Sequence, residues 1–190
     1  MEKISPELRK LIDNKNSCRQ LIRDRIATLS NAYITEQSEK ICTQIAHILQ
    51  ENHAHHVALF AARKGEVNLL PLLQLLPTTS YYFPRVCGPR EMQFHKISNP
   101  SEFTIGKWGI REPHATALVI EPHRLDYIIV PGSAFSLDGK RLGYGGGFYD
   151  SLLPKTTAVR LAVCFPCQIL ETIPTEPHDC SVHHVITGES

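Results

Sequence analysis

The run LDYIIVP at residues 125–131 constrains the fold more than any other part of the chain. It is continuously apolar and rich in β-branched side chains, whereas a strand with one solvated face alternates between apolar and polar residues. Such a run is typical of a central strand that is covered on both faces. We therefore expect this segment to lie inside a sheet, with helices packed on each side of it.

The neighbouring segments predict the elements that surround this strand. Apolar residues recur at helical spacing over residues 7–29, and again after Thr35, where Thr-Glu is typical of a helix start. A short helix is predicted at residues 67–76. Further strands are predicted at residues 55–62, 81–86, 92–97, 116–120 and 160–165. This mixture predicts a three-layer α/β/α sandwich with a mostly parallel, Rossmann-like sheet.

Composition limits the classes of function. The 190 residues suit a single domain, which we expect to span residues 1–190, with a core that needs no disulfide. Twenty basic residues offset nineteen acidic ones, which disfavours binding to nucleic acid or to a membrane surface. The charged N-terminus resembles neither a signal peptide nor a membrane span. We therefore expect a cytoplasmic monomer with free thiols that acts on small molecules.

A glycine-rich segment follows the central strand. Residues 138–150, DGKRLGYGGGFYD, contain five of the chain's 11 glycines. Ligands bind at the carboxyl ends of strands in such sheets, and successive N–H groups of a glycine-rich loop can form an anion-binding concavity. A helix that begins near Gly147 would add donors, Lys140 and Arg141 would add positive charge, and Asp150 could hold a divalent cation.

The residues alone leave two interpretations of this segment open. A flexible or hairpin loop without a ligand fits the composition as well as a phosphate-binding loop does. Two standard phosphate motifs are excluded, because no Gly-Lys-Ser/Thr sequence is present and Phe148 stands where the dinucleotide fingerprint needs its third glycine.

A longer motif that contains this segment is more specific. Residues 130–150 read VPGSAFSLDGKRLGYGGGFYD and closely resemble the signature of the 5-formyltetrahydrofolate cyclo-ligase family, also called methenyltetrahydrofolate synthetases. Other segments resemble the family in the same order along the chain. They are KNSCR at 15–19, GEV at 65–67, and the stretches at 83–97, 106–113 and 161–187. The resemblance covers about residues 15–188.

The resemblance implies an ATP- and Mg²⁺-dependent ring closure. 5-Formyltetrahydrofolate and ATP would give 5,10-methenyltetrahydrofolate, ADP and phosphate. A formamide oxygen is a poor leaving group, and transfer of the γ-phosphoryl group to it would allow the N10 amine to attack. The protein's part in such a reaction is positioning and charge neutralisation.

The resemblance also implies roles for individual residues. For ATP, the expected contacts are Lys15, Arg19, Arg141, Leu142, Gly143, Tyr144, Gly145, Gly146, Gly147, Phe148 and Tyr149. Arg141 and Tyr149 are the expected catalytic residues, and Asp150 is the expected Mg²⁺ ligand. For the folate, the expected contacts are Glu66, Trp108, Tyr144, Gly145, Gly146, Gly147 and Phe148.

Each of these residues has an ordinary structural alternative. Lys15 and Arg19 are four residues apart and could simply form a solvated helix face. Asp150 could be a favourable acid in the first turn of a helix, and Glu66 a surface acid after a strand. Trp108 could pack in the core.

Two departures from the family pattern bear on the site. Phe148 stands where members usually have a tyrosine, so a hydroxyl is lost while the ring remains. His183 stands where members commonly have an aspartate that contacts a metal in some of them. Histidine suits a hard, oxygen-binding ion less well, so Mg²⁺ would depend on Asp150 alone or with Asp179.

Two rival functions follow from other residues. Cys164 and Cys167 form a Cys-x-x-Cys, which a histidine-rich stretch follows, so a zinc or redox site is conceivable. The segment nevertheless predicts a strand that runs into a proline bend, not a zinc knuckle. The second rival is a non-catalytic folate- or nucleotide-binding protein on the same scaffold, which only the His183 departure favours.

Overall fold

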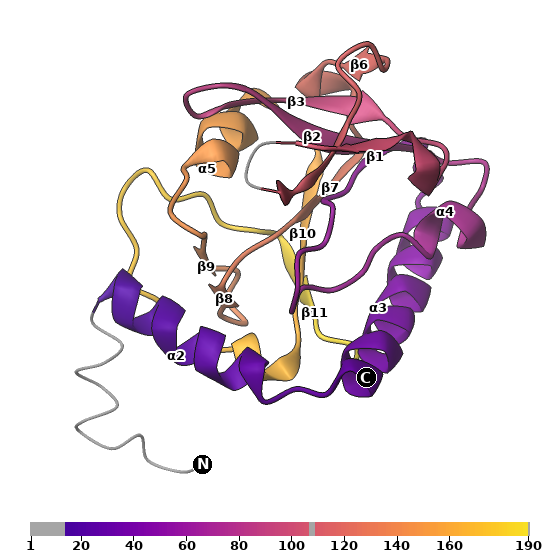
Figure 1. The fold of residues 1–190 in the computed structure, drawn as a ribbon. Helices are drawn as coiled ribbons and strands as arrows, with labels where there is room; N and C mark the ends of the chain where they lie inside the picture. Colours follow the sequence, from indigo (N-terminus) through magenta and orange to yellow (C-terminus); the bar gives the residue numbers. More distant parts are fainter. Residues whose placement is uncertain (1–13, 107–108, 190) are drawn as a thin grey trace.

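The central run forms strand β7 (Tyr127–Val130), and all four of its residues are buried. The computed structural model describes residues 14–106 and 109–189, and places β7 inside a seven-stranded sheet of order β11-β10-β7-β1-β2-β3-β6 (Figure 1). The other strands are β11 (His184–Ile186), β10 (Val159–Val163), β1 (His56–Ala58), β2 (Ser80–Gly88), β3 (Glu91–Lys96) and β6 (Val119–Ile120). Pairing from β11 to β2 is parallel, and only β3 and β6 add antiparallel contacts. The mostly parallel sheet is confirmed.

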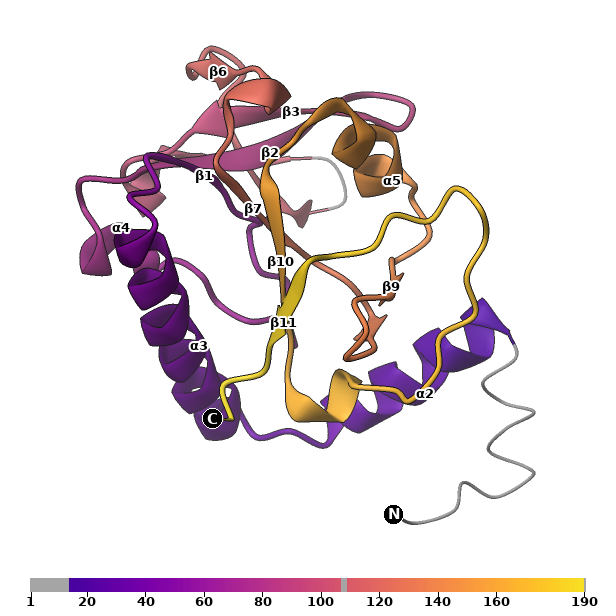
Figure 2. The same ribbon diagram turned by 180° about the vertical axis from the view of Figure 1, so that it is seen from behind.

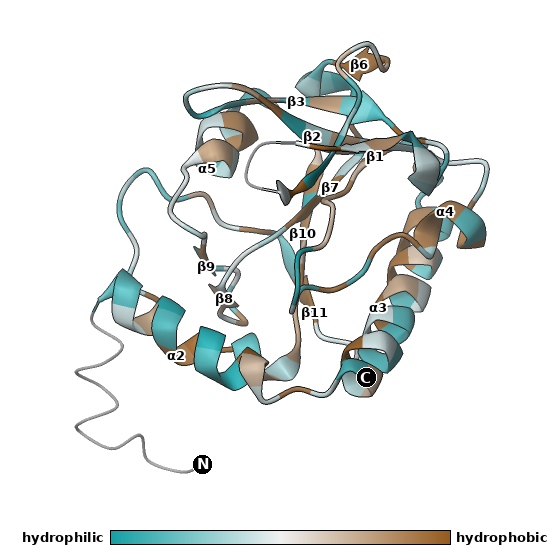
Figure 3. Ribbon diagram, in the orientation of Figure 1, coloured by the Kyte–Doolittle hydropathy of each residue, from teal (hydrophilic) through white to brown (hydrophobic). Residues whose placement is uncertain are grey.

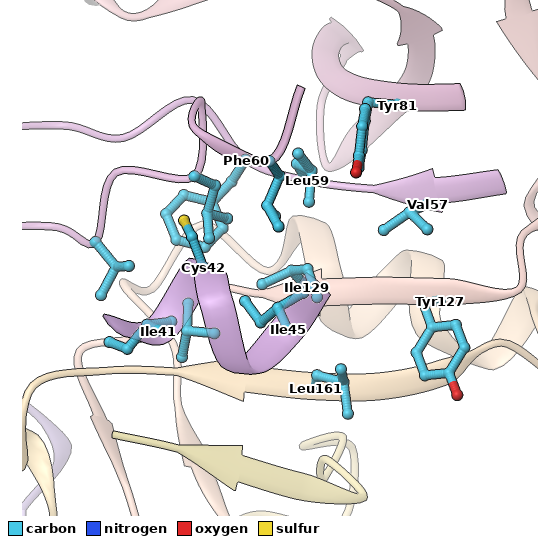
Figure 4. Packing of buried hydrophobic residues seen from close by; sticks show 14 of the residues in the cluster. Ile41, Cys42, Ile45, Val57, Leu59, Phe60, Tyr81, Tyr127, Ile129 and Leu161 are labelled. Carbon is cyan, nitrogen blue, oxygen red and sulfur yellow. The ribbon is translucent and has the colours of Figure 1, made fainter. Parts of the chain in front are cut away.

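Helix α3 (Asn31–Glu51) covers one face of the sheet (Figures 1 and 2). It begins four residues before the predicted Thr35, because the Ser30 side chain caps it by accepting a hydrogen bond from the Tyr33 N–H at 3.1 Å. Its side chains Ile41 and Ile45 point toward β-strand residues such as Ile129 (Figure 4).

Alternate residues of the central strands face opposite layers. Ile129 of β7 belongs to the core beneath α3, whereas Ile128 belongs to the core on the other face. That second core includes Leu152 of α5 (Phe148–Leu152) and Leu153 of the 3₁₀ turn that follows it. In Figure 3, brown marks the hydrophobic residues along β7 and β10. The three-layer α/β/α prediction is confirmed.

Two other helices are shorter than the sequence predicts. α2 (Lys15–Ala27) is capped by Asn14, and the earlier part of the helix predicted over residues 7–29 lies outside the described residues. The helix predicted over residues 67–76 is reduced to α4 (Leu72–Leu75), because Pro71 has no N–H to donate and fits only at a helix start.

Two small ribbons complete the described chain. β4 (Phe103–Ile105) pairs with β5 (Arg111–Pro113), and β8 (Ala134–Phe135) pairs with β9 (Arg141–Leu142). The second ribbon leads directly into the glycine-rich segment. None of the helices in the described ranges is both long enough and apolar enough to cross a bilayer.

Replacing Leu49 by alanine should test the core between α3 and the sheet. Leu49 is 1% exposed, so the change removes buried methyl groups and leaves a cavity. We expect Leu49→Ala to lower the free energy of unfolding by about 2–5 kcal/mol in urea titration. Leu118→Ala is the matched control, because Leu118 is 66% exposed, and should change it by less than about 0.5 kcal/mol. Equal losses in the two variants would contradict this assignment of the core.

Candidate functional site

The glycine-rich segment lies between two adjoining pockets. The charged pocket, of about 360 Å³, lies between α2, the start of α5 and residues 176–179. The apolar pocket, of about 410 Å³, is lined by residues that follow β1 and β7 at their carboxyl ends, including Phe60 and Pro131. Four residues of the segment line both pockets: Gly143, Gly145, Gly147 and Asp150. The segment thus adjoins ligand-sized cavities at the carboxyl ends of the strands, which agrees with the phosphate-binding interpretation of this loop.

Glycine is required in this segment for two physical reasons. Gly145 and Gly147 have φ values of +97° and +70°, a left-handed conformation that strains other residues. Gly147 is also the N-cap of α5, so the helix begins where the sequence predicted. At Gly143, a Cβ atom would lie only 2.8 Å from Nη1 of Arg141. The bare backbone thus allows an arginine to pack against the loop.

Helix α2 supplies two cations to the charged pocket. Lys15 Nζ lies 2.7 Å from Asp179 Oδ2 and 2.6 Å from Glu176 Oε2. Burial disfavours its charge, but hydrogen bonds to the two carboxylates outweigh this and raise the pKa of Lys15. Arg19 donates from Nε to the Gly143 carbonyl at 2.8 Å, which fastens α2 to the glycine-rich segment. The predicted presentation of both cations by one helix is confirmed.

Arg141 and Asp150 form an ion pair beneath the segment. Arg141 is 5% exposed and donates from Nη2 to Asp150 Oδ1, while its Nη1 donates to the Pro131 carbonyl at 3.3 Å. The Cys180 N–H also donates to Asp150 Oδ1, at 3.2 Å. Both of these hydrogen bonds reach Oδ1. No residue that the structure describes donates to Oδ2 of Asp150, so this oxygen is open to a ligand.

Aromatic side chains surround a carboxylate in the apolar pocket. Glu66 accepts from the Arg63 N–H at 2.7 Å and from Arg63 Nη2 at 3.1 Å. The Arg63 guanidinium also lies 4.0 Å from the centre of the Tyr144 ring. Phe148 and Tyr149 line the same pocket, so the structure brings together the described residues predicted for the folate. Trp108, also predicted there, lies outside the described residues.

The hydroxyl of Tyr149 is a buried polar group without a partner. In the described ranges no atom accepts from it or donates to it. Burial raises its pKa, so the hydroxyl keeps its proton at neutral pH. A buried hydroxyl without a partner is costly, and a ligand in the apolar pocket would remove that cost by accepting its hydrogen bond.

The acidic groups of the charged pocket bear on metal binding. Ligand atoms of Glu176, His178 and Asp179 lie within 4.8 Å of one another, but both carboxylates are already ion-paired with Lys15. Asp150 lines the charged pocket and has one carboxylate oxygen to which no described residue donates a hydrogen bond. Carboxylate oxygens are ligands that Mg²⁺ prefers. The environment of Asp150 therefore fits the divalent cation that the sequence predicts.

His183 lies elsewhere. The ring atom Nδ1 of His183 accepts a hydrogen bond from the backbone N–H of Arg160 at 2.9 Å. The backbone N–H of His183 donates to the Arg160 carbonyl, also at 2.9 Å. Burial and the nearby Arg160 lower the pKa of His183, which keeps the ring neutral and able to accept. This side chain belongs to the junction of β10 and β11 and lines neither pocket.

The cysteine pair does not form a reactive or metal-binding site. Cys164 is fully buried, and burial raises its pKa to about 12. Burial also raises the pKa of Cys167, whereas a metal or redox site requires thiolates. The only group of potential metal ligands found in the described ranges contains no cysteine. β10 ends at Val163 and a 3₁₀ turn follows at Pro166–Gln168. The predicted strand that runs into a proline bend is therefore confirmed.

Five arginine and glutamate residues that line the two pockets were missed by the sequence analysis. Arg90, in the turn between β2 and β3, and Glu176 line the charged pocket. The apolar pocket is lined by the other three, Arg63, Arg111 and Glu112. Arg63 precedes Glu66 by three residues, a spacing that allows the observed pair. Arg90 and Glu176 lie in stretches that resemble the family, but both are far in sequence from α2 and from the glycine-rich segment, so nothing in the sequence marked them as site residues.

The similarity to known proteins extends over nearly the whole chain. Residues 11–188 match the 5-formyltetrahydrofolate cyclo-ligase family. The chain is 32% identical over 178 residues to the 5-formyltetrahydrofolate cyclo-ligase of Escherichia coli K12, covering 88% of this chain and 96% of that protein. It is 28% identical over 194 residues to a probable 5-formyltetrahydrofolate cyclo-ligase of Schizosaccharomyces pombe, covering 92% and 95%.

A solved structure has the same fold. The NMR structure of Aquifex aeolicus 5,10-methenyltetrahydrofolate synthetase superimposes with a TM-score of 0.83 and 30% identity, over 93% of this chain and 90% of that one. The sequence and structure comparisons therefore indicate the same family over nearly the whole chain. The chain belongs to the 5-formyltetrahydrofolate cyclo-ligase family.

Proposed function

We propose that this protein converts 5-formyltetrahydrofolate and ATP to 5,10-methenyltetrahydrofolate, ADP and phosphate. The observation that carries the proposal is one glycine-rich segment shared by a charged pocket and an apolar pocket. A triphosphate requires the first kind of pocket and a pterin ring the second. Because the pockets adjoin at this segment, two such ligands would meet there. Membership of the family supports the same reaction.

The reaction needs two substrates in contact rather than a covalent enzyme intermediate. The formyl oxygen attacks the γ-phosphorus, and the bond from that phosphorus to the β,γ-bridging oxygen breaks to release ADP. The N10 amine then attacks the formyl carbon, the N10 proton is lost, and the phosphorylated oxygen leaves as phosphate. The protein accelerates such steps by holding the reacting atoms together and by neutralising charge.

The charged pocket is the proposed ATP site. The N–H groups of its glycines can donate to phosphate oxygens, and Lys15 and Arg19 supply positive charge. A triphosphate carries more charge than Asp179 or Glu176 and would compete with them for Lys15. Asp150 would hold Mg²⁺, which when bound neutralises part of the phosphate charge.

The apolar pocket is the proposed folate site. The Glu66 carboxylate suits the amino-pyrimidinone edge of a pterin, where two donors lie side by side, and Arg63 orients it. Tyr144 and Phe148 offer rings for stacking, and the resemblance adds Trp108. Arg141 and Tyr149 line this pocket together with the shared glycines, which supports the proposal that they are the catalytic residues.

The rival of a non-catalytic binder loses the feature that favoured it, since His183 lines neither pocket. We also propose that residues 1–190 act as one domain, as a cytoplasmic monomer on small-molecule substrates rather than on nucleic acid or a membrane. The near-equal numbers of basic and acidic residues support small-molecule substrates over nucleic acid or a membrane surface.

A spectrophotometric assay tests the proposed reaction directly. Purified protein is mixed with 5-formyltetrahydrofolate, ATP and Mg²⁺, and the near-ultraviolet absorbance of the methenyl product is followed. We expect a rise that requires the protein, ATP and the metal. If folded protein binds ATP or folate but the absorbance does not rise, the protein is a non-catalytic folate- or nucleotide-binding protein and the proposed reaction is wrong.

Asp150→Asn should reduce turnover by about 100-fold or more, because the neutral amide binds Mg²⁺ poorly while it can still accept from the Cys180 N–H. Turnover is measured at limiting Mg²⁺, and thermal melting checks the fold. Asp138→Asn is the matched control from the same segment, because Asp138 lines neither pocket, and should retain activity. Unchanged turnover in Asp150→Asn would remove Asp150 from the metal site.

Lys15→Ala and Glu66→Gln should each raise a different Michaelis constant. Loss of Lys15 should raise the KM for ATP about tenfold and that for folate little, because one charge-assisted contact to phosphate is lost. Loss of the Glu66 charge should raise the KM for folate instead. Steady-state kinetics with each substrate varied in turn gives both values. Equal changes in both constants for either variant would refute its assignment to one pocket.

A further inference from the structure

Arg90 is the cation of the charged pocket that the sequence analysis did not assign to the site. It lies in the two-residue turn between β2 and β3, after Pro89, and its φ of +57° is left-handed. This conformation is uncommon for a residue with a Cβ atom. In Figures 1 and 2 the turn lies beside α5, and β3 packs against that helix. The turn therefore brings an arginine from the far edge of the sheet to the start of α5.

The Arg90 side chain reaches the glycine-rich segment. Its Nε and Cδ atoms would lie 3.4 Å and 3.5 Å from a Cβ atom at Gly147. Together with Gly147, Asp150 and Ser151 it lines the charged pocket, and Lys15 and Arg19 of α2 line the same pocket. Cations thus enter this cavity from two separate elements, α2 and the β2–β3 turn.

The three cations differ in what already neutralises them. Lys15 forms ion pairs with Asp179 and Glu176, and Arg19 donates to the Gly143 carbonyl and to the Asn16 side chain. Arg90 makes neither a hydrogen bond nor an ion pair with any residue that the structure describes. Its charge is therefore available to a ligand at no cost in broken contacts, whereas a ligand of Lys15 must displace two carboxylates.

We propose that Arg90 is a further phosphate-binding residue, which contacts the triphosphate from the α5 side of the charged pocket. This inference rests on the proposed function, because it requires ATP to bind there. A guanidinium presents paired N–H donors that match phosphate oxygens, and it keeps its charge at any physiological pH. Bound ATP would then link the β2–β3 turn to α2 across the cavity.

Arg90→Asn tests this role, since asparagine removes the charge and tolerates a left-handed conformation better than most residues. ATP binding is measured by isothermal titration calorimetry without folate, and both Michaelis constants are measured by the absorbance assay. We expect the Kd and KM for ATP to rise at least about tenfold, and the KM for folate to stay within about twofold. Arg90→Lys, which keeps the charge but loses the planar fork, should recover part of the affinity.

Arg124→Asn is the matched control, because Arg124 is exposed and lines neither pocket. It should bind ATP like the unchanged protein. Thermal melting checks each fold, and Arg90→Gly replaces the asparagine variant if that one does not fold, since glycine adopts a φ of +57° without strain. If the unchanged protein binds ATP and Arg90→Asn matches the Arg124 control, the inference fails and the proposed function stands. If the unchanged protein does not bind ATP, both fail.

Discussion

The ion pair between Arg141 and Asp150 holds the rest of the site in place. Arg141 comes from β9, Asp150 comes from α5, and the same carboxylate accepts from the Cys180 N–H near the C-terminus. A buried arginine without its partner is strongly destabilising, so these segments stay together. The glycines between the two residues then have their path set at both ends. They form the wall that the charged and apolar pockets share.

Charge balance explains the remaining contacts of the charged pocket. Without a ligand, three carboxylates and three cations line this cavity, and Lys15 takes two of the carboxylates. Such internal pairing avoids leaving several like charges together in a partly buried space. An incoming polyanion would change the pairing rather than meet a preformed positive cavity. Selection for a charged ligand then depends on which of these ion pairs it can replace.

The sequence predicted features that depend on local pattern. The apolar run at β7 had no solvated face, and the glycines before α5 needed a left-handed backbone, so both could be recognised from neighbouring residues. Contacts between distant segments could not. Lys15 and Asp179 are separated by 164 positions, and Arg90 reaches Gly147 only because the sheet places β3 beside α5. The resemblance to the family predicted residue types at the site, and the structure added their partners.

The Lys15–Asp179 contact also has a consequence for synthesis of the chain. Residues 176–179 leave the ribosome long after helix α2, because more than 140 residues separate them in the sequence. The central strands β1, β2 and β7 can pair earlier, since each is complete before the C-terminal segment is made. The charged pocket, by contrast, lacks one wall until residues 176–179 have been made. A nascent chain could therefore carry a partly formed sheet while the two carboxylate partners of Lys15 have yet to be made.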